Sequence, residues 1–122
     1  SIVNIASNAG KVGYPNMAAY NASKAAVINL TRTLAAEWAP GINVNAVCPG
    51  GVLTPMLEHV ADVVGSRIGE NPDELLSTMV PAQLNRHIQP REVGKVVAFL
   101  LSDAAIIIRG QSVNVDGGDT PY

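Results

Sequence analysis

The sequence is poor in cysteine, in aromatic residues and in charge. Only one of its 122 residues is cysteine, aromatic side chains make up 4% and charged side chains 15%. The lone Cys48 cannot form an internal disulfide, which fits a protein of the reducing cytoplasm. The formal net charge is -2 and no basic run occurs, so nucleic acids and anionic membranes are poor partners. No apolar run approaches the ~18 residues of a membrane span, so none is expected.

The start of the chain also lacks familiar features. It has neither an initiator Met nor a charged segment followed by an apolar core, so no secretory signal is visible. The chain begins abruptly on an apolar run, which suggests a segment of a longer protein. Because 48% of the residues are hydrophobic, this segment can bury a sizeable core.

Short apolar runs alternate with helical patterns along most of the chain. Residues 1–5, 42–48 and 111–115 have the pattern of buried strands, while residues 18–38 and 90–101 have that of helices. The long helix between the first two strands suits a right-handed parallel crossover. The sequence therefore predicts an α/β fold.

The tract from Val52 to Gln89 is less regular. It contains two short helical pieces, about 55–64 and 72–80, and Gly65, Gly69 and prolines interrupt it. A long insertion of this kind inside a compact domain is usually functional or mobile. We expect residues 54–89 to form a lid over the substrate.

Three polar residues near the first strand could act together. Tyr20 and Lys24 are four residues apart in a helical pattern, which places both on one face. An ammonium one turn away favours the phenolate, so the tyrosine could serve as a general acid or base. Ser7 follows the first strand and could hydrogen-bond a carbonyl or alkoxide oxygen. This set suits interconversion of a carbonyl and an alcohol, with the hydride supplied by a cofactor.

Four motifs in order make the chain resemble the short-chain dehydrogenase/reductase family. Tyr20-Asn21-Ala22-Ser23-Lys24 matches the family's Tyr-x-x-x-Lys motif, and Ser7 stands thirteen residues before the tyrosine. Pro49-Gly50 matches a turn after the next strand, and Val115-Asp116-Gly117-Gly118 a C-terminal signature. The resemblance covers essentially the whole chain, but only the second half of the family's usual length.

The resemblance implies the C-terminal half of a Rossmann-like, doubly wound parallel sheet that contributes its last three strands. It also implies an oxidoreductase that transfers a hydride between NAD or NADP and a secondary alcohol or ketone. Tyr20, Lys24 and Ser7 would be catalytic.

The same resemblance implies where the cofactor lies. Tyr20 and Lys24 would contact it, and the loop with Pro49, Gly50, Val52 and Thr54 would pass along its nicotinamide end. The Gly-rich phosphate loop and the residue that distinguishes NAD from NADP would lie before Ser1. Family members commonly form dimers or tetramers, so a homo-oligomer is expected.

Blander interpretations stay open for each site. Tyr20 and Lys24 could be a surface pair, and Ser7 could cap a turn. His59 and His87 have no second ligand at metal spacing, so no metal site is expected. Two other functions remain: a related epimerase or dehydratase with the same Tyr-x-x-x-Lys motif, and an inactive fragment that acts only in assembly.

Overall fold

The fold is built on a small parallel sheet. The computed structural model describes residues 1–122 and contains three strands, β1 (Ile2–Ile5), β2 (Val44–Pro49) and β3 (Ser112–Val115). They are ordered β1-β2-β3, all parallel, with Ile5 paired to Val47 and Pro49 to Val115. The predicted strands are confirmed, with ends that differ by one or two residues. Helix and strand termini are the least certain part of any such prediction.

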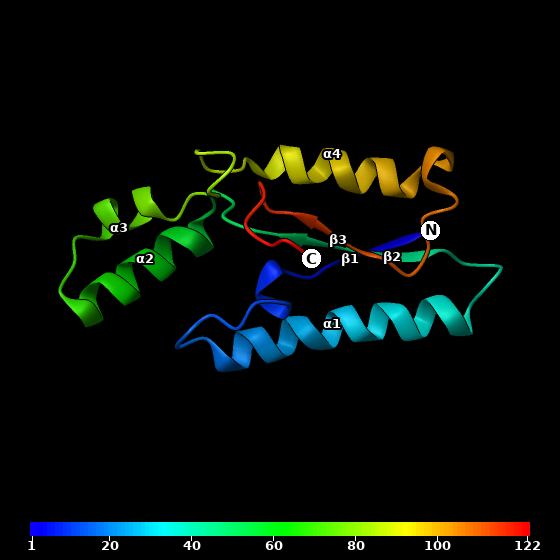
Figure 1. Cartoon of the computed structure of the whole chain (residues 1–122), viewed down its shortest axis with the longest axis horizontal. Coiled ribbons are helices and arrows are strands. Elements are labelled where there is room, and N and C mark those ends of the chain that lie inside the picture. Colours follow the sequence, from blue (N-terminus) through cyan, green and yellow to red (C-terminus); the bar gives the residue numbers. More distant parts are fainter.

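One long helix covers each face of the sheet (Figure 1). Helix α1 (Ala18–Glu37) packs on the face that presents Ala46 and Cys48, through Ile28. Helix α4 (Pro90–Leu101) packs on the other face, where Leu100 meets Val47. Successive residues of a strand point to opposite faces, so one central strand supplies both cores. The predicted Rossmann-like α/β arrangement is confirmed.

Helix α4 has a strong start signal in its sequence. Pro90 occupies the first turn, and Gln89 and Glu92 form a capping box. The box satisfies amide groups that the first turn of a helix otherwise leaves without partners. The helix therefore begins where the sequence predicts.

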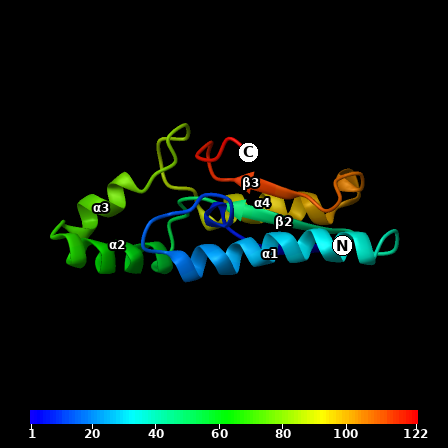
Figure 2. The ribbon, with the colours of Figure 1, turned by 60° about the horizontal axis from the view of Figure 1, so that its bottom comes forward.

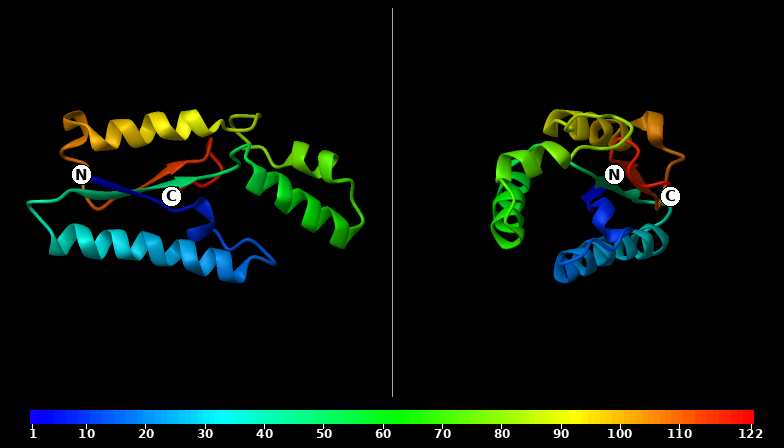
Figure 3. Two further views of the ribbon diagram at one scale, coloured as in Figure 1. Left: turned by 180° about the vertical axis from the view of Figure 1, so that it is seen from behind. Right: turned by 60° about the vertical axis from the view of Figure 1, so that its left-hand side comes forward.

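The insertion after β2 forms a helical hairpin of α2 (Pro55–Ile68) and α3 (Pro72–Thr78). The two helices pack on each other, and neither makes an extensive contact with the sheet, α1 or α4. The views in Figures 2 and 3 agree that the hairpin projects beyond the end of the sheet. At its base, Val52 and Ile88 form an isolated parallel backbone bridge.

The expected break of α2 at Gly65 was wrong. The helix continues through Gly65 and ends at Gly69, whose φ of 75° is the left-handed conformation typical of a helix C-terminus. Gly65 is buried, and a Cβ there would lie 2.9 Å from the carbonyl oxygen of Glu70. Its small size therefore allows α3 to approach α2.

Two short 3-10 helices complete the structure, η1 (Asn8–Gly10) after β1 and η2 (Asp103–Ala105) after α4. Strand β1 has a neighbour on one side only, and Ile5 is 51% exposed. An apolar edge strand of this kind is normally covered in a folded protein.

Among the helices of the chain, none combines the length and the apolar character that crossing a bilayer requires.

Candidate active site

Ser7 lies at the carboxyl edge of the sheet, two residues after β1. Extending the pairing of Ile5 with Val47 by two residues places it beside Pro49. Its side chain is buried, and Oγ accepts a hydrogen bond from the Ala9 amide at 3.1 Å. The capping role considered from the sequence is therefore present. It occupies a lone pair of Ser7 Oγ and leaves the hydroxyl hydrogen available to a ligand.

Tyr20 and Lys24 lie on the same side of α1, one turn apart, as their spacing predicts. Lys24 Nζ is 5.7 Å from the centre of the Tyr20 ring, within range of a cation–π contact. The ammonium also donates to the carbonyl oxygen of Ile5 at 3.2 Å. This bond connects α1 to the end of β1, so Lys24 and Ser7 belong to one small region of the molecule.

Close packing at Gly10 fixes the loop that carries Ser7 against α1. A Cβ on Gly10 would lie 2.7 Å from the backbone carbon of Lys24 and 2.9 Å from Ile28 Cδ1. Such distances are too short for any side chain, so only glycine allows this approach. The loop therefore has little freedom to move away from the Tyr20–Lys24 face.

A network of two asparagines and a tyrosine lies beside these residues, and no sequence pattern predicts it. Asn8 Nδ2 donates to the Tyr14 hydroxyl at 3.0 Å, and Asn21 Nδ2 donates to the Tyr14 carbonyl at 2.9 Å. Burial raises the pKa of Tyr14, and the charge of Asp119 raises it further, although the Asn8 hydrogen bond opposes this. Tyr14 is therefore a neutral hydrogen-bonding group at physiological pH.

Cys48 lies in β2, beside the loop that carries Ser7. Burial raises the pKa of its thiol, although Lys11 and the Ser7 backbone amide act in the opposite direction. A buried thiol with a raised pKa is a poor nucleophile. Cys48 is therefore a packing residue, as its place in a buried strand predicts.

The glycines after β2 approach other parts of the protein. A Cβ on Gly50 would lie 2.7 Å from Asp116 Cβ, and one on Gly51 would lie 2.6 Å from the Met79 carbonyl oxygen. The need for glycine here is already explained by packing within the chain.

Val52 and Thr54 lie together at the base of the hairpin. The Val52 amide donates to the Gly50 carbonyl at 2.8 Å, and the Val52 carbonyl accepts from Thr54 Oγ1 at 3.4 Å and keeps a second lone pair. Thr54 is the N-cap of α2, where its Oγ1 accepts from the Leu57 amide at 3.3 Å. The Lys24 ammonium has three hydrogens and donates one to the Ile5 carbonyl, so it can donate further hydrogen bonds to a ligand. Val52 and Thr54 offer mainly a carbonyl oxygen and a hydroxyl.

The two histidines lie away from this region. His59 is exposed on α2, and His87 Nε2 is 3.0 Å from the Leu76 carbonyl. A cavity of about 460 Å³ also lies elsewhere, between α4 and the end of β3, and none of Ser7, Tyr20 and Lys24 lines it. The chemistry-bearing residues are thus grouped on the α1 side of the sheet edge.

The chain is similar to known proteins over nearly its whole length. The family model described as enoyl-(acyl carrier protein) reductase matches residues 1–120. A short-chain dehydrogenase/reductase of Armillaria gallica is 44% identical over 118 residues, covering 96% of this chain and 44% of that protein. Cyclopentanol dehydrogenase of a Comamonas strain is 42% identical over 120 residues, covering 98% of this chain and 45% of that protein.

A solved structure is also similar over nearly the whole of this chain. The F189W actinorhodin polyketide ketoreductase with NADPH superposes with a TM-score of 0.89 at 40% identity, over 98% of this chain and 47% of that chain. The chain thus spans less than half the length of these relatives. The match over nearly all of its residues shows that the chain belongs to the short-chain dehydrogenase/reductase family.

Proposed function

We propose that this chain is the C-terminal part of an NAD(P)-dependent oxidoreductase that interconverts a secondary alcohol and a ketone. The observation that carries the proposal is the position of Lys24, whose ammonium lies beside the Tyr20 ring and bonds the Ile5 carbonyl at 3.2 Å. That bond holds the Tyr20–Lys24 face against the end of β1, from which Ser7 follows. A proton carrier, a positive charge and a hydroxyl donor are thereby gathered at the sheet edge where α/β proteins bind ligands.

Each of the three residues has a distinct role in this proposal. Tyr20 gives a proton to the substrate oxygen during reduction and takes it back during oxidation. Lys24 places a positive charge beside that tyrosine and supplies further hydrogens for the ribose of the cofactor. Ser7 donates its hydroxyl hydrogen to the substrate oxygen and stabilises the charge that develops there.

The cofactor, NAD or NADP, supplies or accepts the hydride that no side chain can provide. On this chain, Tyr20 and Lys24 would contact its nicotinamide end, with Pro49, Gly50, Val52 and Thr54 along the same side. The Val52 carbonyl and the Thr54 hydroxyl can serve a carboxamide group, which both donates and accepts hydrogen bonds. The ketoreductase with NADPH supports this assignment by its similarity.

The substrate class follows from the relatives in the same way. One is named for a cyclic secondary alcohol and another for a polyketide ketone. We propose a small-molecule alcohol or ketone, selected by a lid formed from residues 54–89. The hairpin of α2 and α3 suits a lid because it packs mainly on itself.

Assembly and location complete the proposal. The exposed surface of α1 is rich in alanine, which permits close approach of a second helix, and we propose a homo-oligomer. The single unpaired Cys48 suits a reducing compartment, and we propose the cytoplasm.

A direct assay tests this function. The complete gene product should oxidise NADH or NADPH in the presence of cyclic and aliphatic ketones, as followed by nicotinamide fluorescence. An epimerase or dehydratase would convert its substrate without net change in the reduced cofactor. An inactive assembly fragment would neither bind cofactor nor turn over any of these ketones.

The isolated segment provides a second test. Residues 1–122 contain no Gly-rich loop at a helix N-terminus that could hold a pyrophosphate. Titration calorimetry of this segment with NADH and NADPH should show no measurable binding. An affinity tighter than about 0.1 mM, roughly -5.5 kcal/mol, would contradict the proposed division of the cofactor site.

A further inference from the structure

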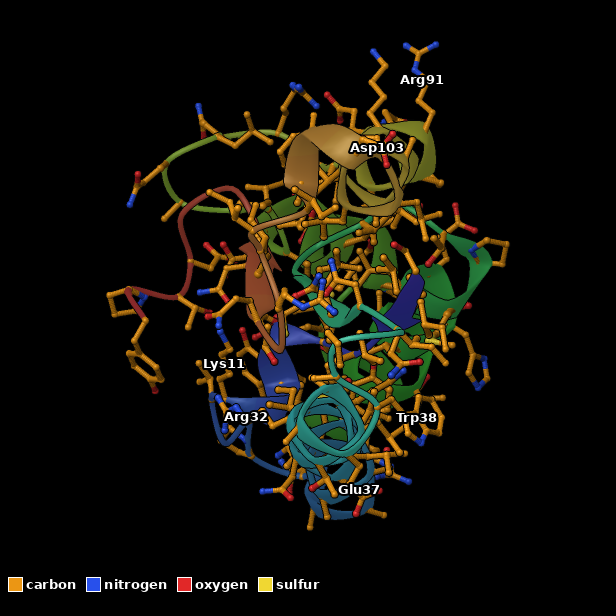
Figure 4. The ribbon with its side chains drawn as sticks, turned by 90° about the vertical axis from the view of Figure 1, so that its right-hand side faces the viewer. Lys11, Arg32, Glu37, Trp38, Arg91 and Asp103 are labelled. Atoms are coloured by element: carbon orange, nitrogen blue, oxygen red, sulfur yellow. The ribbon has the colours of Figure 1, made fainter.

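Lys11 reaches from the Ser7 loop to the far edge of the sheet. Its Nζ donates to the Ser112 carbonyl at 2.8 Å, to Asn114 Oδ1 at 2.7 Å and to the Tyr122 backbone oxygen at 3.3 Å. The first two acceptors belong to β3, more than a hundred residues further along the chain. Figure 4 shows Lys11 on the β3 side of the molecule, opposite to Trp38. The side chain thus uses its three donors to connect the first loop to the last strand.

The C-terminal strap, defined as residues 116–122, folds back over this lysine. Asn114 Nδ2 donates to the backbone oxygens of Thr120 at 3.2 Å and Tyr122 at 2.7 Å. The Tyr122 hydroxyl in turn donates to the Lys11 carbonyl at 3.3 Å. Inside the strap, the buried Asp116 carboxylate accepts from the amide of Gly118 and, at 2.9 Å, from that of Thr120. The strap is therefore held in shape by its own hydrogen bonds. Its Tyr122 bonds both the ammonium and the backbone carbonyl of Lys11.

The strap also forms hydrogen bonds with the base of the hairpin. Asp119 Oδ1 accepts from the Ala82 amide at 2.8 Å, and Gln83 Nε2 donates to the Gly118 carbonyl at 3.0 Å. Ala82 and Gln83 lie in the segment that returns from α3 to α4. A Cβ on Gly117 would lie 2.6 Å from Pro81 Cβ, so the strap and this segment are also in close contact.

The loop transmits the position of Lys11 to Ser7 through a short run of backbone bonds. The Lys11 amide donates to the Asn8 carbonyl at 2.8 Å, and the Gly10 amide donates to the Ser7 carbonyl at 3.0 Å. These bonds make residues 7–11 one compact turn. A displacement of the lysine would therefore move the turn that orients the Ser7 hydroxyl.

We propose that Lys11 is a positioning residue, which ties the Ser7 loop through the C-terminal strap to the base of the α2–α3 hairpin. The inference rests on the proposed function, in which Ser7 orients the substrate oxygen and the hairpin is the lid. The strap then couples the lid base to the catalytic loop, so that a displacement of one also displaces the other. A lysine that only protected the β3 edge would stabilise the protein without affecting the lid base or the rate.

Four variants of the complete gene product test this. Lys11→Met removes the ammonium and keeps most of the stem, and Lys11→Arg keeps the charge. Asp119→Ala cuts the strap from Ala82 at its other end. Lys95→Met is the matched control, because Lys95 is exposed on α4 and its loss changes the net charge equally.

Two readouts are needed. Hydrogen exchange without cofactor should rise in Lys11→Met at residues 7–12 and 116–122, and also at residues 81–84, which Lys11 does not touch. The kcat should fall between about 10- and 100-fold, the range expected for a misplaced catalytic group, while the KM for cofactor stays within about twofold. Lys11→Arg should recover most of the rate, and Lys95→Met should match the wild type in both readouts.

Other results would overturn the inference. An unchanged kcat in Lys11→Met, or exchange that rises at residues 7–12 but not at 81–84, shows that the strap transmits nothing. A uniform rise across the chain shows a purely structural lysine. If Lys11→Met does not fold, Asp119→Ala decides, because it should raise exchange at 7–12 from the far end. If the wild type transfers no hydride to any ketone, the proposed function fails, and the exchange data still decide whether the strap couples the two segments.

Discussion

Two connections leave the same edge of the sheet and are built in opposite ways. The loop after β1 is buried from Ala6 to Ala9, and it is fixed to α1 by the contact at Gly10. The segment after β2 extends into the hairpin of α2 and α3, which packs mainly on itself. The first carries Ser7 and leads directly to Tyr20. The second carries no candidate catalytic residue.

This difference separates two requirements of an enzyme site. Groups that transfer protons or stabilise charge need fixed positions, because small displacements cost large factors in rate. A segment that admits and releases substrate needs the opposite, a low cost of moving away from the body. Under the proposed function, the packed loop after β1 would meet the first requirement and the hairpin of α2 and α3 would meet the second.

The largest difference expected between the two connections is in the rate. Ser7→Ala should lower kcat by about 10²–10³-fold, the usual result of removing a donor to a developing oxyanion. Thr54→Ala, at the base of the hairpin, should lower kcat by less than tenfold and cost ~1 kcal/mol of stability as a lost helix cap. Steady-state kinetics and urea unfolding of both variants check this. Equal losses of kcat in the two variants would contradict the proposed difference between the two connections.

The next effect is on stability within the rigid loop itself. Gly10→Ala should destabilise the protein by about 1–3 kcal/mol, because its Cβ would overlap the backbone of α1. Gly13→Ala in the same loop is the control, with no atom within 4 Å of its Cβ, and should stay within about 0.5 kcal/mol of the wild type. Urea unfolding measures both. A Gly10→Ala protein as stable as the control would show that the loop is not held by this contact.

A smaller contrast should appear in the exchange of backbone amides. Amides of α2 and α3 should exchange at least roughly tenfold faster than those of α1 when no ligand is bound, because few contacts outside the hairpin oppose its opening. Hydrogen-exchange mass spectrometry of the complete gene product measures this. Equal protection of the hairpin and α1 would refute the lid.

The smallest effect concerns the link between the hairpin base and α4. The guanidinium of Arg86, 2.7 Å from Glu92, together with the Gln89 amide, lowers the pKa of Glu92 to about 2. Since this pKa lies below the ordinary value of 4.5, the ionised carboxylate stabilises the fold above about pH 4.5. The stabilisation is lost as the pH falls from there towards 2.

Glu92→Gln isolates that contribution, because glutamine can still complete the capping box without a charge. The variant should be slightly less stable than the wild type at neutral pH, and the difference should shrink as the pH is lowered through this range. Arg86 is exposed and Glu92 is about one-third exposed, so solvent screens the pair and the effect is small. Thermal unfolding across pH would contradict this account if the difference stayed constant.

The sequence predicted the body of the fold better than its insertion. The strands and α1 have apolar residues at regular intervals, and Pro90 marks the start of α4. In α2 the same kind of reasoning is wrong, because an internal Gly65 predicts a break where the helix continues. Whether an internal glycine breaks a helix or admits a neighbour depends on what packs there, and Glu70 and Pro72 decide it.

The site divides in a similar way. The placement of Tyr20 and Lys24 follows from helical spacing, which is local. Lys11 and Tyr14 gave no signal, because the partners of Lys11 lie about a hundred residues away and Tyr14 interacts through a loop of irregular shape. The close contact between Gly50 and Asp116 also joins segments that are far apart in the sequence. Contacts between distant segments are invisible until the chain is folded.

The most direct test of the central claim is Tyr20→Phe in the complete gene product. Removal of one hydroxyl eliminates the proton path and leaves the ring, its contact with Lys24 and the packing of α1 in place. We predict that kcat falls by about 10²–10⁴-fold, the usual contribution of general acid–base catalysis, while the Kd for NAD(P) from titration stays unchanged. A variant that keeps more than about a tenth of the wild-type kcat would contradict the assignment of Tyr20 as the proton donor.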